Sequence, residues 1–332
     1  MIYQEDNLLI KEVFDQSNHS FVIDSISRIS KGKNNRTYLV QNSKNKFIAK
    51  FYFSSNADTR NRLSNEFNFL QYAKEINIHC VPKPVIKSDR YNLGIYEFIN
   101  ARPFNSVDLG KNDVIAAADF FSSLNPLDRS DQYQNLEFAS EAFLDMQIFA
   151  NNIDLRIATL VNVLKEKHSS NEINFFAKDL QEIWIKVKLS LSKNKNLIQH
   201  NQSLCVSPSD FGFHNALIQK DKIFFIDFEY AGIDDCAKVI CDFFIQPEIK
   251  VPSKYLELFV SRAFLSFEKK DLLLERAIKL FPLFQIKWCC IMMNEFLPDI
   301  AERRLFSNPD LDIEASQFQQ LKKASSLLLE IN

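Results

Sequence analysis

Three side chains in the second half of the chain have the types and the spacing that phosphoryl transfer needs. Asp210 precedes Asn215 by five residues, and Asp227 follows Asn215 after twelve more, at the end of an apolar run. Transfer from ATP uses one carboxylate to accept the proton of the attacking hydroxyl, and an amide and a second carboxylate to hold Mg²⁺. The spacing therefore predicts Asp210 as the catalytic base and Asn215 with Asp227 as the metal ligands.

Two short strands are expected to bring these side chains together. Residues 216–219 and 223–227 have the pattern of antiparallel strands joined by a polar turn. A hairpin of this length folds Asp227 back beside Asn215, so that both can reach one metal ion. The structural alternative is that these residues only form turns, which Asp and Asn also favour.

The tripeptide Asp210-Phe211-Gly212 admits a second assignment, because protein kinases usually place their metal-binding aspartate in this tripeptide. A catalytic aspartate with an asparagine five residues later should then lie upstream. The nearest upstream candidate, Asp179, has Trp184 at that position. We therefore assign the base to Asp210.

A lysine and a glutamate upstream can form a second constellation. Residues 47–53 form an apolar, strand-like run that contains Lys50, and a buried ammonium needs anionic partners. Glu66 comes sixteen residues later, on the apolar face of a predicted helix. That face also carries Leu63, Phe67, Leu70 and Ala73. We expect Lys50 to pair with Glu66 and the α- and β-phosphates of ATP; the alternative is a snorkelling lysine and a surface glutamate.

The segment before this strand is a candidate phosphate loop. Gly32, Asn34 and Asn35 are residue types that tolerate positive φ, so their backbone N–H groups can curl around phosphate oxygens. A plain β-hairpin turn is the alternative for this segment taken alone.

A strand at residues 94–99 leads into a proline-containing segment that is typical of a hinge. The backbone groups of Glu97, Phe98 and Ile99 are predicted to hydrogen-bond the edge of an adenine. The clearest boundary in the chain also lies near residue 100.

Together these features resemble the aminoglycoside phosphotransferase and choline/ethanolamine kinase superfamily over residues 28–245. The resemblance rests on Asn35–Tyr38, Lys50, Glu66, Tyr96–Phe98, Asp210–Asn215 and Ile226–Gly232, in the order of the family. It implies an α+β, protein-kinase-like fold of two lobes with ATP and Mg²⁺ as cofactors. The N-lobe, residues 1–99, would hold an antiparallel sheet and a helix, and the mostly helical C-lobe would span residues 100–332.

The family roles carry over to the matching positions. The resemblance makes Asp210 the base, Asn215 and Asp227 the Mg²⁺ ligands, and Lys50 with Glu66 the phosphate-positioning pair. The run from residue 228 to residue 232 looks more like choline/ethanolamine kinases than like most antibiotic kinases.

Departures from the family pattern leave an alternative function open. Pro208 and Ser209 stand where the family usually has a histidine and a glycine before the catalytic aspartate. The segment from Asp234 to Lys238 also replaces the usual Gly-Asp-Pro, so its supporting contacts cannot be transferred. The alternative is a catalytically weak or inactive pseudokinase that binds a nucleotide or a partner. A helical binding protein would need several chance matches in the right order.

The acceptor is not determined by these patterns. Tyr230 and Trp288 can form an aromatic box for a quaternary ammonium group, as in choline. Glu295, Asp299 and Glu302 can instead hold a polyamine-like aminoglycoside, or can form a solvated helix end. A sugar acceptor remains a third class.

Composition narrows the partners and the compartment. The chain has 332 residues, 46% of them hydrophobic, and a net charge of −2 without a basic stripe, so nucleic acid is a poor candidate partner. The six cysteines lack metal-ligand spacing, which favours reduced thiols in a cytoplasmic protein. No signal-peptide core or membrane-length apolar segment is evident, and the oligomeric state is left open.

The remaining C-terminal part has the apolar spacing of helices. These are expected at residues 114–124, 141–164, 175–191, 254–267 and 272–296, with Pro282 as a candidate break in the last. His214 lies within the catalytic loop, and we assign it a structural role in preference to substrate contact.

Overall fold

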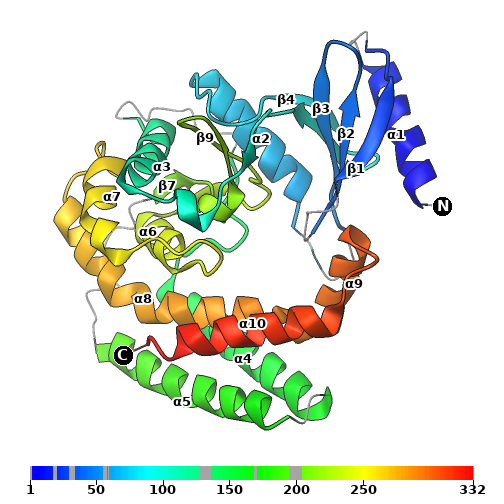
Figure 1. Cartoon of the computed structure of the whole chain (residues 1–332). Helices are drawn as coiled ribbons and strands as arrows, with labels where there is room; N and C mark the ends of the chain where they lie inside the picture. Colours follow the sequence, from blue (N-terminus) through cyan, green and yellow to red (C-terminus); the bar gives the residue numbers. More distant parts are fainter. Residues whose placement is uncertain are drawn as a thin grey trace.

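The protein is divided into a β-rich N-terminal lobe and a helical C-terminal lobe (Figure 1). The computed structural model describes residues 2–17, 21–29, 34–54, 58, 60–126, 136–167, 170–193 and 204–331. Within these residues, no helix is both long and apolar enough to cross a membrane.

The N-lobe contains a five-stranded antiparallel sheet in the order β1-β2-β3-β5-β4. Its strands are β1 (Ser25–Ile29), β2 (Arg36–Gln41), β3 (Lys46–Phe51), β4 (Pro84–Ser88) and β5 (Leu93–Glu97). Helix α1 (Ile2–Gln16) packs on one face, where Ala49 and Phe51 meet Phe14 in one apolar cluster. Because side chains alternate across a strand, Lys50 points to the opposite face, which carries α2 (Arg62–Glu75).

Helix α2 confirms the predicted amphipathic pattern. Asn61 caps its first turn by accepting a hydrogen bond from the backbone of Ser64. The four apolar positions expected on the buried face are all buried, and Glu66 is buried with them at 5% exposure. This helix therefore delivers a carboxylate to the inner face of the sheet.

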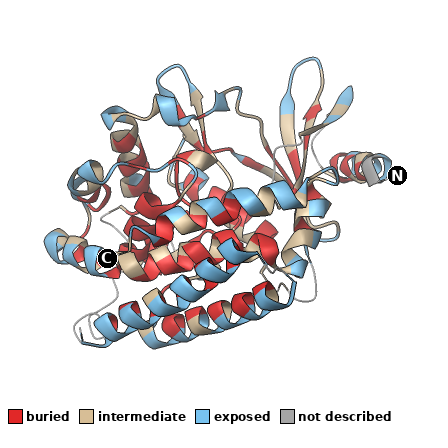
Figure 2. Cartoon of the chain, turned by 60° about the horizontal axis from the view of Figure 1, so that its bottom comes forward, coloured by how far each residue is buried: buried red, intermediate tan, exposed pale blue. Residues whose placement is uncertain are grey.

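The C-lobe is built from eight long helices among the described residues. They are α3 (Lys111–Leu124), α4 (Met146–Lys167), α5 (Asn171–Lys193), α6 (Cys236–Ile245), α7 (Leu256–Ala263), α8 (Lys270–Met293), α9 (Pro298–Ser307) and α10 (Ile313–Leu328). Helices α8 and α10 lie side by side, and α6 packs against α8 (Figure 1). Every residue of α6 is buried, whereas the outer helices expose one face to solvent (Figure 2).

Short strands and 3₁₀ turns connect the helices to the lobe boundary. Strand β7 (Leu204–Ser207) pairs with β10 (Gly232–Asp235), and β6 (Arg102–Pro103), β8 (Ala216–Gln219) and β9 (Lys222–Phe225) form a three-stranded sheet. The 3₁₀ turns are η1 (Ser106–Asp108), η3 (Phe213–Asn215), η4 (Ser253–Tyr255) and η5 (Asn294–Phe296). The predicted hairpin is thus confirmed as β8 and β9.

The structure corrects two helix predictions. Helix α8 runs through Pro282 without a break, so the candidate break there is wrong. Leu280 and Leu283 on either side of the proline are fully buried, and this packing offsets the hydrogen bond that proline cannot donate. Helix α4 begins at Met146 and not at residue 141, because Asp145 accepts a hydrogen bond from the backbone of Ile148 (2.7 Å) and caps it.

Candidate active site

The loop between β7 and β8 carries Asp210 on two buried aromatic anchors. Phe211 stacks on Phe243 of α6 with ring centroids 4.9 Å apart, and Phe213 stacks on Phe104 at 4.7 Å. The side chain of Asp210 between them is 35% exposed and lines a cavity of about 540 Å³ between the lobes. The aromatic core therefore fixes the loop and leaves its carboxylate accessible.

The hairpin of β8 and β9 brings Asn215 and Asp227 to the same cavity. The side-chain nitrogen of Asn215 donates to the backbone oxygen of Asp210 (3.0 Å) and to its Oδ2 atom (3.2 Å). The backbone N–H of Ile226 donates to the carbonyl of Asn215 (2.9 Å). Asp227 follows directly, beyond the end of the strand, with φ at 70°.

Lys50 links the two lobes through its ammonium group. Its Nζ atom lies 2.6 Å from Glu66 Oε2 and 2.6 Å from Asp227 Oδ1. The hydroxyl of Tyr52 donates to the same Glu66 oxygen at 2.6 Å. The expected Lys50–Glu66 pair is thus formed, and it also reaches the candidate metal ligand Asp227.

The two aspartates of the site differ in their electrostatic surroundings. Burial raises the pKa of Asp210, but the neighbouring His214 and the hydrogen bond from Asn215 lower it by more than burial raises it. The net shift of this pKa is therefore downward. Burial, together with the charges of Glu229 and Glu66, raises the pKa of Asp227 to about 6 despite the opposing charge of Lys50. Asp210 is therefore ionised at neutral pH, while Asp227 lies in a region rich in negative charge.

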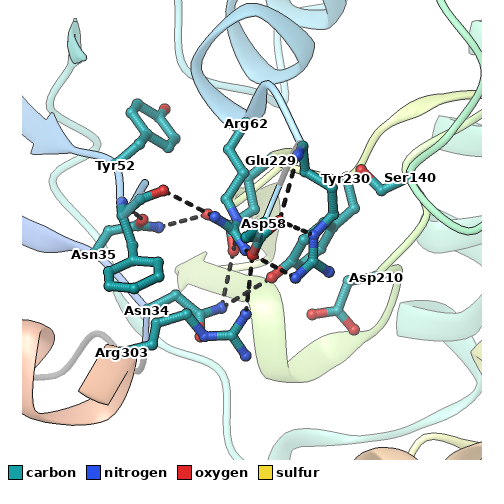
Figure 3. A network of polar contacts seen from close by, with 12 residues as sticks. Asn34, Asn35, Tyr52, Asp58, Arg62, Ser140, Asp210, Glu229, Tyr230 and Arg303 are labelled. Carbon is teal, nitrogen blue, oxygen red and sulfur yellow. Dashed lines mark hydrogen bonds and ion pairs between the residues drawn. The ribbon is translucent and has the colours of Figure 1, made fainter. Parts of the chain in front are cut away.

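The candidate phosphate loop is only partly described. Gly32 lies outside the described residues. Asn34 and Asn35 direct their side-chain nitrogens to Glu229, at 2.8 Å and 2.5 Å, and Asn34 also lies 3.2 Å from the hydroxyl of Tyr230 (Figure 3). These two asparagines therefore tie the start of β2 to the C-lobe, and both line the cavity.

The hinge residues lie at the end of β5 and do not line that cavity. The backbone N–H of Glu97 donates to the carbonyl of Lys83 (2.9 Å), so this donor is used within the N-lobe. The ring of Phe98 has the ammonium of Lys46 at 5.5 Å, and the carbonyl of Ile99 accepts from Ala101 (2.9 Å). The structure thus gathers the candidate residues Lys50, Asp210, Asn215 and Asp227 around one cavity and places the predicted adenine contacts outside its lining.

His214 contacts the candidate base directly, which sequence reasoning did not anticipate. Its Nε2 atom lies 3.2 Å from Oδ1 of Asp210, which is four residues earlier in the chain and precedes the 3₁₀ turn η3. Burial lowers the pKa of His214, but the charge of Asp210 raises it by more than burial lowers it. The net shift of this pKa is therefore upward. The sequence carried no periodic signal for this contact, because Asp210 lies in the loop before η3 and not on a helix with His214.

The segment that departs from the family pattern forms a buried ion network at the start of α6. Lys238 Nζ lies 2.7 Å from Asp234 Oδ2 and 2.9 Å from Asp242 Oδ2. Asp235 caps α6 by accepting from the backbone of Ala237 at 2.8 Å. Asp234 also accepts from the backbone of the segment that precedes α4. In this chain the segment is therefore supported by ion pairs of Lys238 and by the helix cap at Asp235.

The candidate acceptor residues are already engaged with other side chains. Trp288 donates its indole N–H to Asp242 (2.9 Å), and the ring of Tyr230 has the guanidinium of Arg60 at 5.4 Å. Glu295 is buried and forms a 2.7 Å ion pair with Arg304. The other two predicted acids, Asp299 and Glu302, lie exposed on α9. Of the five, Tyr230, Trp288 and Glu295 line the cavity.

Comparisons with known proteins agree with this geometry. A model of the phosphotransferase enzyme family matches residues 25–245, which is more than half of the chain. No curated protein sequence matches the chain significantly.

Solved structures resemble the chain along almost its whole length. A spectinomycin phosphotransferase in complex with ADP and spectinomycin is 12% identical, with a TM-score of 0.63 and coverage of 97% of this chain and 98% of that chain. An ethanolamine kinase from Plasmodium vivax is 17% identical, with a TM-score of 0.61 and coverage of 96% and 87%. A choline kinase from Streptococcus pneumoniae is 12% identical, with a TM-score of 0.60 and coverage of 98% and 99%. These neighbours confirm the expected two-lobe, protein-kinase-like α+β fold.

Proposed function

The chain belongs to the phosphotransferase enzyme family, and we propose that it transfers the γ-phosphoryl group of Mg·ATP to a hydroxyl of a small molecule. One observation carries this proposal: Lys50 of β3, Asp210 and Asn215 of the β7–β8 loop, and Asp227 after β9 come from three separate segments and line a single cavity. We place the lobe boundary at residues 99 and 100, with nucleotide bound between the N-lobe (residues 1–99) and the C-lobe (residues 100–332).

The side chains at the cleft fit a magnesium ion. Mg²⁺ in nucleotide sites is usually bound by one or two protein oxygens together with phosphates and water. The amide nitrogen of Asn215 is engaged with Asp210, and its oxygen is the atom that can serve a metal. Asp227 contributes a carboxylate that is 40% exposed in its side chain. When bound, the metal would offset the negative charge that develops on the phosphoryl group.

The reaction forms a bond between the acceptor oxygen and the γ-phosphorus and breaks the bond from that phosphorus to the β,γ-bridging oxygen. Asp210 accepts the proton of the acceptor hydroxyl, for which it must be ionised, as its lowered pKa provides. Glu66 and Tyr52 hold the ammonium of Lys50 at the inner face of the sheet, from which it can meet the phosphates. The products are ADP and a phosphate ester.

The proposal is tested by Mg-dependent release of ADP over a panel of alcohols: choline, ethanolamine, aminoglycosides, hexoses and amino sugars. We expect acceptor-stimulated release that falls by about 10²–10⁴-fold in Asp210→Asn, which is the range for loss of a general base. Release that is unchanged in this variant would contradict the role of Asp210. A nucleotide-binding protein that transfers no phosphoryl group to any acceptor would be the pseudokinase alternative.

A further inference from the structure

Three arginines converge on one carboxylate beside the catalytic cavity. Arg60 makes two hydrogen bonds to Asp58, each of 2.7 Å, and Arg62 donates to its Oδ2 atom (Figure 3). Arg303 of α9 reaches the same Oδ2 atom at 3.8 Å. We call Arg60, Arg62 and Arg303 the arginine cluster.

The cluster carries more positive charge than its partners balance. Asp58 is shared by all three guanidinium groups, and Glu229 lies 4.0 Å from Arg62. The charge of Glu141 also acts on Arg60, but Glu141 is itself paired with Arg156 (2.5 Å). Glu229 also accepts hydrogen bonds from Asn34 and Asn35, the two asparagines that directly precede β2. A third guanidinium therefore remains weakly paired, and that guanidinium is Arg303.

Arg303 is buried without adequate compensation. It is only 7% exposed, and among the described residues its Nε atom has no hydrogen-bond partner. Burial, and the neighbouring charges of Arg304, Arg62 and Arg60, lower the pKa of Arg303. Burying an unpaired cation is costly, and a bound anion would offset that cost.

The cluster opens into the catalytic cavity. Arg60 and Arg303 line the 540 Å³ cavity that contains Asp210, and both also line an adjoining cavity of about 580 Å³. The two cavities share Ser140 in their walls. In Figure 3, Asp210 lies on the side of Tyr230 opposite Asn35. A small molecule bound in the shared cavity with its hydroxyl at Asp210 can therefore extend to the guanidinium groups of Arg60 and Arg303.

The other acids of the cavity lining are already paired with cations. The ion pairs are Glu295 with Arg304 (2.7 Å), Asp242 with Lys238 (2.9 Å), Glu141 with Arg156 (2.5 Å) and Glu248 with Lys323 (2.9 Å). The ring of Tyr230 already faces Arg60 at 5.4 Å and Arg62 at 5.8 Å, which places cations where a quaternary ammonium would bind. Apart from Asp210 and Asp227, the described lining thus offers no unpaired carboxylate to a cationic acceptor.

From this juxtaposition we infer that the acceptor alcohol carries a phosphate or carboxylate group, which Arg60 and Arg303 bind while the hydroxyl meets Asp210. Guanidinium groups bind such oxyanions through paired, charge-assisted hydrogen bonds. Arg62, with its side chain 1% exposed, lines neither cavity and contributes to the cluster by holding Asp58. This inference rests on the proposed function and specifies its acceptor class.

A binding experiment tests the anion site without requiring turnover. The full chain is saturated with Mg²⁺ and a non-hydrolysable ATP analogue, so that the γ-phosphate position is filled, and is titrated with inorganic phosphate by calorimetry. We expect saturable binding to the wild type that is weakened by at least roughly tenfold in Arg303→Gln and in Arg60→Gln. Arg303→Lys should weaken binding as well, because lysine keeps the charge but loses the paired donors.

The matched control is Arg90→Gln, which removes an arginine in the turn between β4 and β5 with a side chain 74% exposed. It should bind phosphate like the wild type. Unfolding midpoints of all variants identify any loss of binding that reflects misfolding. Absence of phosphate binding to the wild type, or equal affinity in the wild type and both glutamine variants, would overturn the inference.

Turnover then distinguishes the acceptor from the nucleotide as the source of the anion. Acceptors are compared in matched pairs: glycerol with glycerol 3-phosphate, glucose with glucose 6-phosphate, and ethanolamine with glycolate. We expect higher kcat/KM for the anionic member, and a KM for it that rises at least roughly tenfold in Arg303→Gln while the KM for ATP changes by less than about twofold. A rise in the KM for ATP alone would assign the cluster to the nucleotide and contradict the inference. Failure of every acceptor would count against the proposed function, while the phosphate titration decides the anion site by itself.

Discussion

At the scale of single residues, the site holds two side chains in left-handed backbone conformations. Ser209 has φ at 64° and Asp227 has φ at 70°. Aspartate tolerates this region, whereas for serine it costs on the order of 1 kcal/mol or more. The backbone N–H of Ser209 donates to the hydroxyl of Ser207 (3.0 Å), which helps to fix the turn that presents Asp210. Local strain at Ser209 therefore accompanies the placement of the candidate base Asp210.

This strain predicts that Ser209→Gly stabilises the protein by about 1 kcal/mol, because glycine adopts positive φ without a steric cost. The hydrogen bond from the backbone N–H of residue 209 to the hydroxyl of Ser207 is retained in this variant. The free energy of unfolding in urea measures the effect. Ser123→Gly in helix α3 is the control, and it should destabilise by about 0.5 kcal/mol. A loss of stability in Ser209→Gly would show that the serine side chain contributes more than its backbone costs.

At the scale of elements, helix α6 is anchored by buried ion pairs in addition to its apolar contacts. Lys238 is 1% exposed and pairs with Asp234 and Asp242, and Lys287 of α8 lies 3.2 Å from the same Asp242. Burial raises the pKa of Asp242, but Lys238 and Lys287 lower it by more, so that the net shift of this pKa is downward. This network anchors the helix whose Phe243 supports the catalytic loop.

Replacing Lys238 with methionine should therefore cost about 3–5 kcal/mol at pH 7, because it leaves buried carboxylates with one cation fewer. The folded-state pKa of Asp242 then rises. A raised folded-state pKa costs stability above that pKa and costs none below the unfolded-state value of about 3.9, so the deficit should shrink as the pH falls from 7 towards 4.

Urea unfolding at several pH values measures this deficit against Lys279→Met. Lys279 forms an exposed pair with Glu275 on α8, so its loss should change the stability by less than about 1 kcal/mol. A Lys238→Met deficit that stayed constant or grew in acid would contradict the charge argument.

Those residues of the site could be predicted for which the helical period or the length of a hairpin determines where the side chain points. The helical period placed Glu66 on the buried face of α2, and the short hairpin brought Asp227 back towards Asn215. Helices α1, α9 and α10 were not predicted. The arginine cluster was missed because Arg60 and Arg303 are far apart in the chain, and only the packing of α9 against the N-lobe segment brings them together.

At the scale of the whole molecule, polar contacts join the lobes across the cleft. Lys50 of β3 meets Asp227, Asn35 meets Glu229, and the hydroxyl of Ser307 in α9 donates to the carbonyl of Asn35 (3.1 Å). A nucleotide bound between the lobes would add contacts to both. Binding to the folded state alone stabilises it by about 2.7 kcal/mol when the ligand concentration is one hundred times Kd.

We therefore expect Mg²⁺ with a non-hydrolysable ATP analogue to raise the unfolding temperature by about 4 °C at that concentration. Asp227→Asn should lose the Mg-dependent part of this increase, because its carboxylate is a proposed ligand of the metal. Thermal unfolding with the analogue in Mg²⁺ and in EDTA separates the two parts. An equal Mg-dependent increase in wild type and variant would remove Asp227 from the metal site.

The central claim is that the cavity around Asp210 transfers a phosphoryl group from ATP to an alcohol. Its most direct test follows label from [γ-³²P]ATP into a mixture of small-molecule alcohols, with chromatographic separation of the products. We expect an organic phosphate ester that requires Mg²⁺ and is formed by the wild type, with formation reduced by about 10²–10⁴-fold in Asp210→Asn. Label that appeared only as inorganic phosphate, at equal rates in wild type and variant, would contradict it.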